Sequence, residues 1–315
     1  MPTPGADDVL VRVSKVGVCG SDTHYYRDGH LGSFVVDGPL VLGHEAAGTI
    51  VGVGAAVDTG RIGQRVSIEP QRPDPDSAET RRGDYHLCPH MQFFGTPPVD
   101  GAFCDYVTIG AAFAHPVPDG VTDDAAALCE PLSVGIAAVR KARLEPGGRV
   151  LIAGAGPIGL VVAQVARAFG ASELIVSDPD AARRKRALDF GATTALDPTS
   201  DDVGDVAVDA FIDASGAPAA VTSGIHAVRP AGTVVLVGSG AESMTLPTQV
   251  IQNRELVLTG VFRYANTWPA AIELVESGRV DLDAMVTARF PLERVAEALD
   301  SDRVPGTVKT VVTLS

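Results

Sequence analysis

The sequence predicts an α/β protein of two domains, one rich in β-strands and one built on a doubly wound parallel sheet. Its 315 residues exceed the roughly 250–300 at which a single hydrophobic core stops growing. The first 125 residues carry short β-branched runs between glycines and prolines, which is typical of a small barrel or partly open sheet. From residue 149 onward apolar strands alternate with helical segments, which indicates parallel strands joined by crossover helices.

In the β-rich part, alternating and β-branched residues predict three strands, at residues 9–16, 47–53 and 64–68. Residues 71–85 are polar and rich in proline, so we expect an exposed loop there. A helix is expected over residues 125–142. It leads into the second part of the chain.

The second part is expected to contain four strands, all of them largely apolar runs: residues 149–153, 173–177, 206–214 and 233–238. Helices are expected at 157–169 and 181–190. The segment 195–207 is short for a parallel crossover, which usually takes a dozen residues or more, so we expect a shortened or missing helix. After residue 262 the pattern returns to mixed structure, with a helix at 269–276 and a last strand at 307–313.

The composition excludes several classes of function. A net charge of −14 and an aromatic content of 5% argue against nucleic acid or an anionic membrane as a partner. Four cysteines are too few for a disulfide scaffold, and the first residues lack the pattern of a secretory leader. The longest apolar run, residues 150–163, is too short to span a bilayer. We therefore expect a cytoplasmic protein whose cysteines are free thiols or metal ligands.

A glycine-rich turn, Gly154-Ala-Gly156-Pro-Ile-Gly159, follows an expected strand and opens a helix. In a Rossmann fold these glycines allow a tight turn, close approach of the pyrophosphate and packing of the helix on the sheet. Asp178, at the end of the next strand, would accept from a ribose 2′-hydroxyl and repel a 2′-phosphate, which favours NAD over NADP. A turn that binds nothing is the alternative. Arg183 would either reach the adenosine or be a solvated helix arginine.

Four residues are candidate metal ligands: Cys19, His44, Glu45 and Glu130. A thiolate, an imidazole and carboxylates are ligands that zinc accepts, and a catalytic zinc keeps one position open for substrate. Spacing alone does not show that these residues converge, because only the fold joins them. A buried cysteine, a hydrogen-bonded histidine and surface glutamates are the alternative.

The segments around these ligands resemble the zinc-dependent medium-chain dehydrogenase/reductase superfamily. They read Gly-Val-Cys19-Gly-Ser-Asp-Thr-His-Tyr, Val-Leu-Gly-His44-Glu45-Ala-Ala-Gly and Glu130-Pro-Leu-Ser-Val-Gly. Three further segments are similar to the polyol branch, which includes the sorbitol (L-iditol 2-) and xylitol dehydrogenases: Tyr85-His-Leu-Cys-Pro89, Thr96-Pro-Pro-Val-Asp-Gly101 and Gly260-Val-Phe-Arg263-Tyr264-Ala-Asn-Thr-Trp-Pro269. The resemblance covers nearly the whole chain.

The resemblance implies a GroES-like catalytic domain of residues 1–130 and 262–315, and a Rossmann coenzyme domain of residues 131–261. Zinc would be held by Cys19 and His44 with Glu45 or Glu130 as third ligand, a choice that stays open. Substrate contacts are implied for Tyr25, Phe93, Glu130, Arg263 and Tyr264. Coenzyme contacts are implied for Gly154, Gly156, Ile158, Gly159, Asp178, Arg183, Val237, Gly238, Ser239, Val261, Phe262 and Arg263.

The implied activity is oxidation of a secondary hydroxyl of a polyol to the ketose, with hydride transfer to NAD. Zinc would acidify the hydroxyl, and Ser21 and His24, expected in the turn after Cys19, are candidates for a proton relay; a surface histidine is the alternative for His24. Two other functions are weighed. One is a related zinc dehydrogenase of another alcohol, such as threonine or a butanediol, and the other is an inactive dinucleotide-binding relative.

The sequence departs from the family at two places. Many relatives hold a structural zinc on four cysteines, but here Asp74, Ser77 and Thr80 stand at three of the positions and Cys88 at the fourth. Because serine and threonine are poor zinc ligands, we expect one catalytic zinc, no structural zinc and a looser lobe at 71–88. Relatives also begin about one β-hairpin earlier. The family further implies a homo-oligomer, most often a tetramer.

Overall fold

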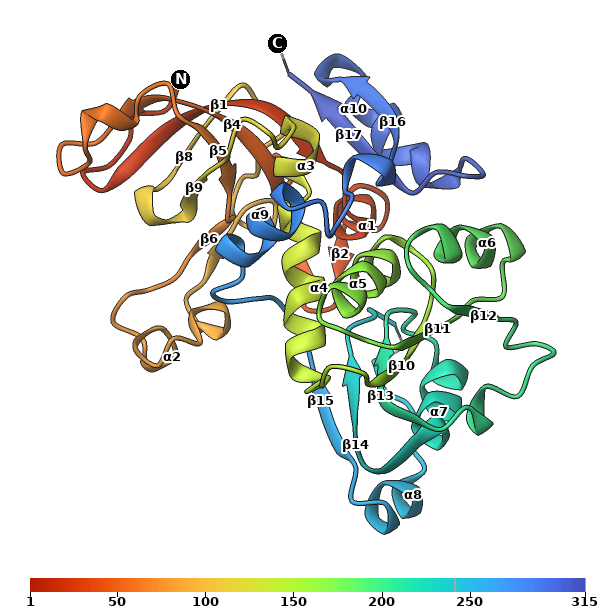
Figure 1. Ribbon diagram of the computed structural model, residues 1–315. Helices are drawn as coiled ribbons and strands as arrows, with labels where there is room; N and C mark the ends of the chain where they lie inside the picture. Colours follow the sequence, from red (N-terminus) through yellow and green to blue (C-terminus); the bar gives the residue numbers. More distant parts are fainter. Residues whose placement is uncertain (241, 315) are drawn as a thin grey trace. The chain divides into compact units, whose positions relative to one another are not determined.

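The computed structural model describes residues 1–240 and 242–314, which form two compact units (Figure 1). The first unit is Met1–Glu130 with Ala265–Ser315, and the second is Pro131–Tyr264. The second boundary thus falls after Tyr264, where the sequence analysis expected it after residue 261. No helix within the described ranges is long and apolar enough to cross a membrane.

The first unit is built on one seven-stranded sheet, in the order β16-β17-β1-β4-β5-β9 with β8 also paired to β1. The strands are β1 (Asp8–Gly17), β4 (Glu45–Val53), β5 (Arg65–Ile68), β8 (Tyr106–Gly110), β9 (Ala114–Pro116), β16 (Val286–Pro291) and β17 (Lys309–Thr313). Two small sheets pair β2 (His30–Leu31) with β3 (Phe34–Val35), and β6 (Gln71–Arg72) with β7 (Gln92–Phe93). Alternate residues of β1, among them Val9, Val11 and Val13, are buried in the core that this sheet covers.

The helices of the first unit correct three expectations. They are α1 (Gly20–Asp28), α2 (Ala78–Arg81), α3 (Asp123–Ala127), α9 (Trp268–Glu276) and α10 (Val295–Asp300), and α4 (Cys129–Lys141) begins in this unit. Residues 20–28 form a helix rather than a turn. Gly29, in the left-handed region at φ 73°, ends this helix. The helix expected at 125–142 is two helices separated at Leu128, and the loop expected at 71–85 contains β6 and α2.

The second unit contains a six-stranded, entirely parallel sheet in the order β12-β11-β10-β13-β14-β15. Its strands are β10 (Arg149–Ala153), β11 (Glu173–Ser177), β12 (Thr194–Leu196), β13 (Val208–Asp213), β14 (Val228–Leu236) and β15 (Val257–Gly260). Its other helices are α5 (Pro157–Ala168), α6 (Ala181–Asp189), α7 (Pro218–Ala227) and α8 (Thr248–Asn253). The strand order reverses at β10, and ligands of such sheets bind at the carboxyl ends of the strands around this point.

The short crossover expected at residues 195–207 is confirmed. A single 3₁₀ turn, Val203–Asp205, stands between β12 and β13 where these folds usually have an α-helix. Val203 is buried and belongs to the same apolar cluster as Phe211 and Val221. One valine therefore takes over part of the packing that a full helix would supply.

Candidate functional site

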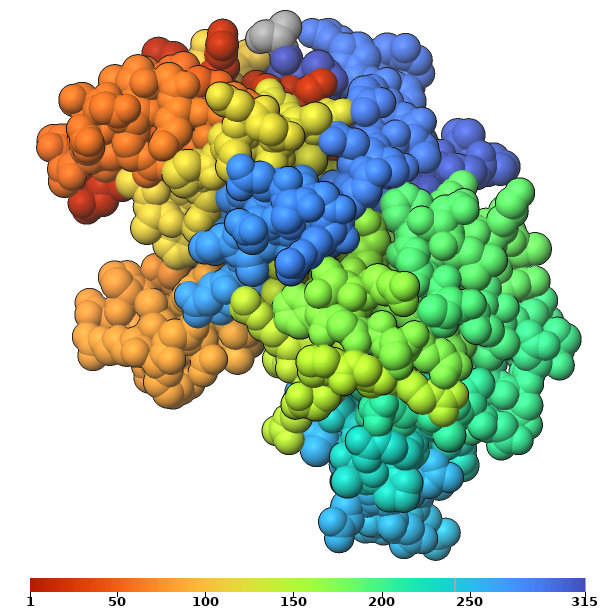
Figure 2. Space-filling model, viewed as in Figure 1, coloured from red at the N-terminus to blue at the C-terminus, as the bar shows by residue number. Residues whose placement is uncertain are grey.

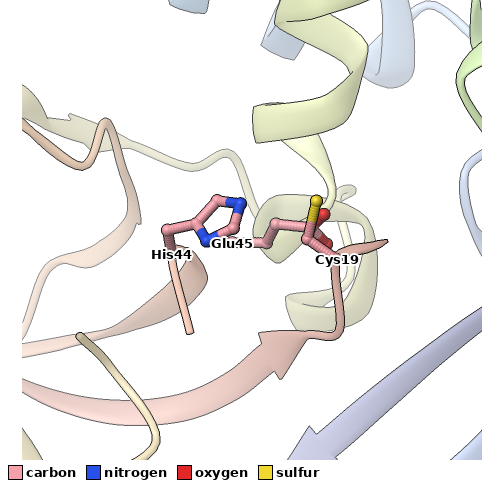
Figure 3. Close-up of side chains that lie close together, drawn as sticks. All are labelled: Cys19, His44 and Glu45. Carbon is pink, nitrogen blue, oxygen red and sulfur yellow. The ribbon is translucent and has the colours of Figure 1, made fainter. Parts of the chain in front are cut away.

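The Cys19, His44 and Glu45 side chains lie together in the first unit (Figure 3). One ligand atom of each residue lies within 4.8 Å of the other two. The antiparallel register of β1 and β4 explains the meeting, because Gly17 pairs with Glu45 and Cys19 follows two residues later. His44 and Glu45 are buried, whereas Cys19 is partly exposed. The cluster is therefore reachable from the sulfur side.

The cluster fits a zinc ion. Its thiolate, imidazole and carboxylate are all zinc ligands. The second carboxylate oxygen of Glu45 is buried and has no hydrogen-bond partner among the residues described, which is costly unless something satisfies it. Residue 17 has to be glycine to leave this oxygen room, since a Cβ there would lie 2.0 Å from it.

Asp22, which the sequence analysis missed, joins the two ligand segments. Its carboxylate accepts hydrogen bonds from the backbone N–H of Cys19 and of Gly43, both at 3.0 Å, and lies 3.5 Å from His44 Nδ1. Burial opposes the charge of Asp22, but His44 and the two N–H donors outweigh it and hold its pKa below 3.8. The sequence signal was an acidic residue three positions after the helix N-cap Cys19, which is the capping-box spacing.

Lys309 is a second residue that the sequence analysis missed. Its Nζ lies 2.5 Å from Glu45 Oε1 and 2.7 Å from the carbonyl oxygen of Val18, and its side chain is buried. Burial disfavours the ammonium charge, yet Glu45 and Cys19 outweigh burial and raise the pKa of Lys309. The available signal was a lysine at the start of a last strand, Lys309–Thr313, that carries no other charge. Lys309 fixes one carboxylate oxygen of Glu45 and leaves the other for a cation.

Three further predicted residues, Tyr25, Phe93 and Glu130, are buried. The Phe93 ring lies 5.5 Å from the His44 ring, centroid to centroid, and Tyr25 is buried on α1. Glu130, at the first turn of α4, is buried and close enough to Lys309 to help raise its pKa. Glu130 is not part of the three-residue cluster as it stands.

The two relay candidates lie on α1. Ser21 and His24 are three residues apart and therefore neighbours on the helix surface. More than half of the His24 side chain is exposed, and its Nδ1 lies 2.9 Å from Asp28 Oδ2. His24 thus connects with solvent.

Residues 262–264 end the second unit. Tyr264 is buried there, and the Arg263 guanidinium lies 4.6 Å from the centroid of the Phe262 ring. Phe262 is 61% exposed. The substrate role of Arg263 and Tyr264 stays a prediction.

The lobe at residues 71–88 keeps its four positions together without a set of thiolates. The Cys88 sulfur accepts from the Asp74 N–H at 3.2 Å, and the Ser77 and Thr80 hydroxyls are 2.9 Å apart. Burial raises the pKa of Cys88, but hydrogen bonds from Ser77 and Asp74 lower it by more. The lobe, around α2, projects from its unit (Figures 1 and 2). The expected absence of a zinc ion from this lobe stays a prediction.

The glycine-rich turn of the second unit has the geometry of a phosphate-binding turn. Gly154 has φ +93°, and a Cβ on Gly159 would lie 1.9 Å from the Gly154 carbonyl oxygen. Around Gly156 nothing within 4 Å of a Cβ position occupies the space, so the backbone is open to a ligand. Asp178 is buried and accepts from the N–H of Ala155 at 2.8 Å, which ties the second strand to this turn.

The remaining predicted coenzyme residues follow the carboxyl ends of the parallel strands or begin the helix after one. Ile158 lies in the first turn of α5, and Arg183 is exposed on α6. Val237, Gly238 and Ser239 follow β14, and Val261, Phe262 and Arg263 follow β15. Asp213, which the sequence analysis missed, ends β13, and its carbonyl oxygen accepts from the N–H groups of Val237 and Gly238.

Comparisons with known proteins place this chain among dehydrogenases. Residues 5–119 match the alcohol dehydrogenase GroES-like domain, and residues 157–277 match the zinc-binding dehydrogenase domain. Sorbitol dehydrogenase of Macaca fascicularis is 43% identical over 311 residues, which cover 96% of this chain and 87% of that protein.

Solved structures of the same fold include L-idonate 5-dehydrogenase from Escherichia coli, with a TM-score of 0.93 and 28% identity over 98% of this chain and 91% of that one. A zinc-binding dehydrogenase from Sinorhizobium meliloti, solved with NADP, has a TM-score of 0.91 and 30% identity over 99% of this chain and 93% of that one. The predicted fold class, a GroES-like domain with a Rossmann sheet, is confirmed. The chain belongs to the zinc-dependent medium-chain dehydrogenase/reductase superfamily, in its polyol branch.

Proposed function

We propose that this protein oxidises a secondary hydroxyl of a polyol, such as sorbitol or xylitol, to the ketose, with hydride transfer to NAD. The observation that carries the proposal is the convergence of Cys19, His44 and Glu45 in a chain of this family. Three protein ligands of this kind leave a coordination position for substrate. When bound, zinc supplies Lewis-acid polarisation of the substrate hydroxyl oxygen.

The chain's own residues select and orient the substrate. By family resemblance the substrate contacts would be Tyr25, Phe93, Glu130, Arg263 and Tyr264. Among them, Arg263 and Tyr264 would offer N–H and O–H donors to the extra hydroxyls of a polyol. A site that pairs hydroxyls rejects analogues that lack them by large factors, because its buried polar groups are then left unpaired. This favours a polyol over a simple alcohol.

The hydroxyl proton leaves through α1. Ser21 passes the proton toward His24, whose Nδ1 faces Asp28 and whose ring is exposed. The exposed ring then releases the proton to water.

The second unit would hold NAD. The open space at Gly156 accommodates the pyrophosphate next to the N-terminus of α5, where the helix dipole favours negative charge. The buried carboxylate of Asp178 would accept from the ribose 2′-hydroxyl. The two units would then divide the work: residues 1–130 and 265–315 would hold the metal, and residues 131–264 would hold the coenzyme.

Two finer properties belong to the same proposal. We expect one catalytic zinc per chain and none in the lobe at 71–88, where Cys88 is the only thiol among the four equivalent positions. We also expect a homo-oligomer, a tetramer by family resemblance. Metal analysis and light scattering of the purified protein measure the two properties.

A substrate panel with metal analysis tests the function. Protein purified without chelator is expected to hold one zinc per chain and to produce NADH from sorbitol or xylitol, with threonine, butanediol and ethanol as poor substrates. Chelation should abolish the activity and zinc should restore it. Cys19→Ala should lose zinc and activity, whereas Cys104→Ala, which removes a thiol outside the cluster, should keep both.

Each other result has a specific meaning. If the protein oxidises threonine or butanediol faster than it oxidises the polyols, the proposed substrate class is wrong. NAD binding without turnover of any alcohol would indicate an inactive relative. Activity that survives complete removal of zinc would refute the role of the cluster.

A further inference from the structure

Two aspartates occupy adjacent backbone positions just after paired strands of the parallel sheet. Strands β11 and β12 are paired so that Ser177 is opposite Leu196, and the next residues are Asp178 and Asp197. The Asp178 N–H donates to the Leu196 carbonyl at 3.2 Å, which extends the pairing to this point. The sequence analysis assigned Asp178 but gave no role to Asp197.

Arg184 connects the ends of these two strands, through the backbone of Asp178 and the carboxylate of Asp197. It comes from the first turns of α6, which packs against both β11 and β12. Its Nη1 donates to the carbonyl oxygens of Asp178 at 2.7 Å and Pro179 at 2.9 Å, and its Nη2 lies 2.9 Å from Asp197 Oδ2. About four fifths of the Arg184 side chain is buried. Both hydrogens of Nη1 are therefore used within the protein, and Nη2 is held by an ion pair.

Asp197 is itself held in place. Its other oxygen, Oδ1, accepts from the backbone N–H of Thr199 at 2.9 Å and from the Thr199 hydroxyl at 2.6 Å. Its own N–H donates to Asp201. The carboxylate that binds Arg184 thus belongs to a fixed turn.

This arrangement bears on the choice between NAD and NADP. In a Rossmann fold the acidic residue after the second strand meets the ribose, and an arginine near it accommodates a 2′-phosphate in enzymes that use NADP. A phosphate brings about −1.5 to −2 charges at neutral pH. Arg184 is bound to the backbone of Asp178, the acidic residue after the second strand, but its guanidinium is already directed at Asp197 and at two carbonyls.

We propose that Arg184 is a coenzyme-selectivity residue that Asp197 keeps from a 2′-phosphate, so that NADP is excluded by two carboxylates and not by Asp178 alone. The inference rests on the proposed function only in taking the second unit as the coenzyme site. Removing Asp178 alone leaves Arg184 paired with Asp197. Removing Asp197 as well frees Nη2 of Arg184 to meet a 2′-phosphate, while Nη1 stays on the two backbone carbonyls.

The test is a fluorescence titration of the purified full-length protein with NADH and with NADPH, which needs neither zinc nor a polyol. Four proteins are compared: wild type, Asp178→Ser, Asp197→Asn and the double variant. We expect each single variant to favour NADPH modestly. The double variant should exceed the product of the single effects by about tenfold, the size of coupling found within one ion-pair network. In assays of turnover, the double variant should have a lower KM for NADP than wild type and a similar kcat.

Two variants of cationic residues on α6 assign the effect. Adding Arg184→Leu to the double variant should abolish the gain in NADPH affinity, whereas adding Lys185→Leu, which removes an exposed cation of the same helix, should preserve it. Asp189→Asn removes an exposed carboxylate at the far end of α6 and should change neither affinity. Thermal unfolding verifies that each variant is folded.

The outcomes separate this inference from the proposed function. Additive effects of the two aspartates, or a gain in NADPH affinity that survives Arg184→Leu, would overturn the inference. If Asp178→Ser does not fold, the Asp197→Asn variant alone tests the inference. A ratio of NADH to NADPH affinity equal to that of wild type would then overturn the inference. A protein that shows the expected coupling but oxidises no polyol would contradict the proposed function alone.

Discussion

Replacing Asp22 with asparagine tests whether this residue positions the zinc ligands. Its two carboxylate oxygens each accept one buried backbone N–H, from Cys19 and from Gly43. Asparagine offers one oxygen and an NH₂ group, which cannot accept, so one N–H is left unsatisfied. A hydrogen bond to a charged group contributes about 1.5–3 kcal/mol, so we expect the metal-free protein to lose about 2–3 kcal/mol of stability.

The effect on zinc should be larger than the loss of stability alone suggests. Partners that orient metal ligands typically change metal affinity by about 10–100-fold when mutated. We expect a loss in this range for Asp22→Asn, measured by competition with a chromophoric chelator. Stability is measured by urea unfolding, with the fluorescence of the single tryptophan, Trp268, which is buried in the first unit.

The control is Asp28→Asn, which removes a carboxylate of the same helix that is 54% exposed and pairs with His24. Its stability should stay within about 0.5 kcal/mol of wild type.

The stability of wild type and of Asp22→Asn in acid gives an independent check. Because the pKa of Asp22 lies below 3.8 in the folded protein, its contribution is complete above that value and is lost as the pH falls through the lower folded pKa. Wild type should therefore lose stability in acid more steeply than Asp22→Asn; parallel acid profiles with equal zinc affinity would refute this reasoning.

Three other substitutions or modifications probe the same unit. Gly17→Ala should displace the Glu45 carboxylate and lower the zinc content, whereas Gly20→Ala, with nothing within 4 Å of its Cβ position, should retain zinc; equal metal content in both would contradict the close packing at residue 17. Lys309→Met leaves Glu45 uncompensated in the metal-free protein and should cost about 3–5 kcal/mol in urea unfolding, and a loss below about 1 kcal/mol would rule out a buried ion pair of that importance. Thiol alkylation of the metal-free protein should modify Cys19, and zinc should protect it. Cys129, whose pKa burial raises to about 12, should not react until the protein unfolds, so its labelling in the native state would count against the structure.

Local patterns predicted four of the six strands in the sheet of the second unit and missed the short strands β12 and β15. The strands at 149–153 and 173–177 have the expected bounds, and the glycine-rich turn follows the first of them. Apolar runs bounded by glycine identify buried parallel strands because both faces of such a sheet are covered. The helices of the first unit were harder to predict, because they are short and their ends are not marked in the sequence pattern. The break at Leu128, between α3 and α4, is an example.

The identity of the candidate ligands came from motif resemblance, and their convergence from the fold. Cys19 and Glu45 meet because β1 and β4 pair in one register, with Gly17 opposite Glu45. A shift of that register by one residue would turn every side chain of a strand to the other face. No spacing along the chain encodes this choice.

The sequence by itself determined the fold class, the dinucleotide turn with Asp178, and which residue types could bind a metal, because these depend on neighbours along the chain. The tertiary structure alone decided that Lys309, 264 residues away, fixes Glu45, and that Arg184 instead of the neighbouring Arg183 is held by Asp197. Those contacts depend on which strands pair and on the phase of a helix against the sheet. Both are set by packing of the whole domain, and local residue preferences do not specify them.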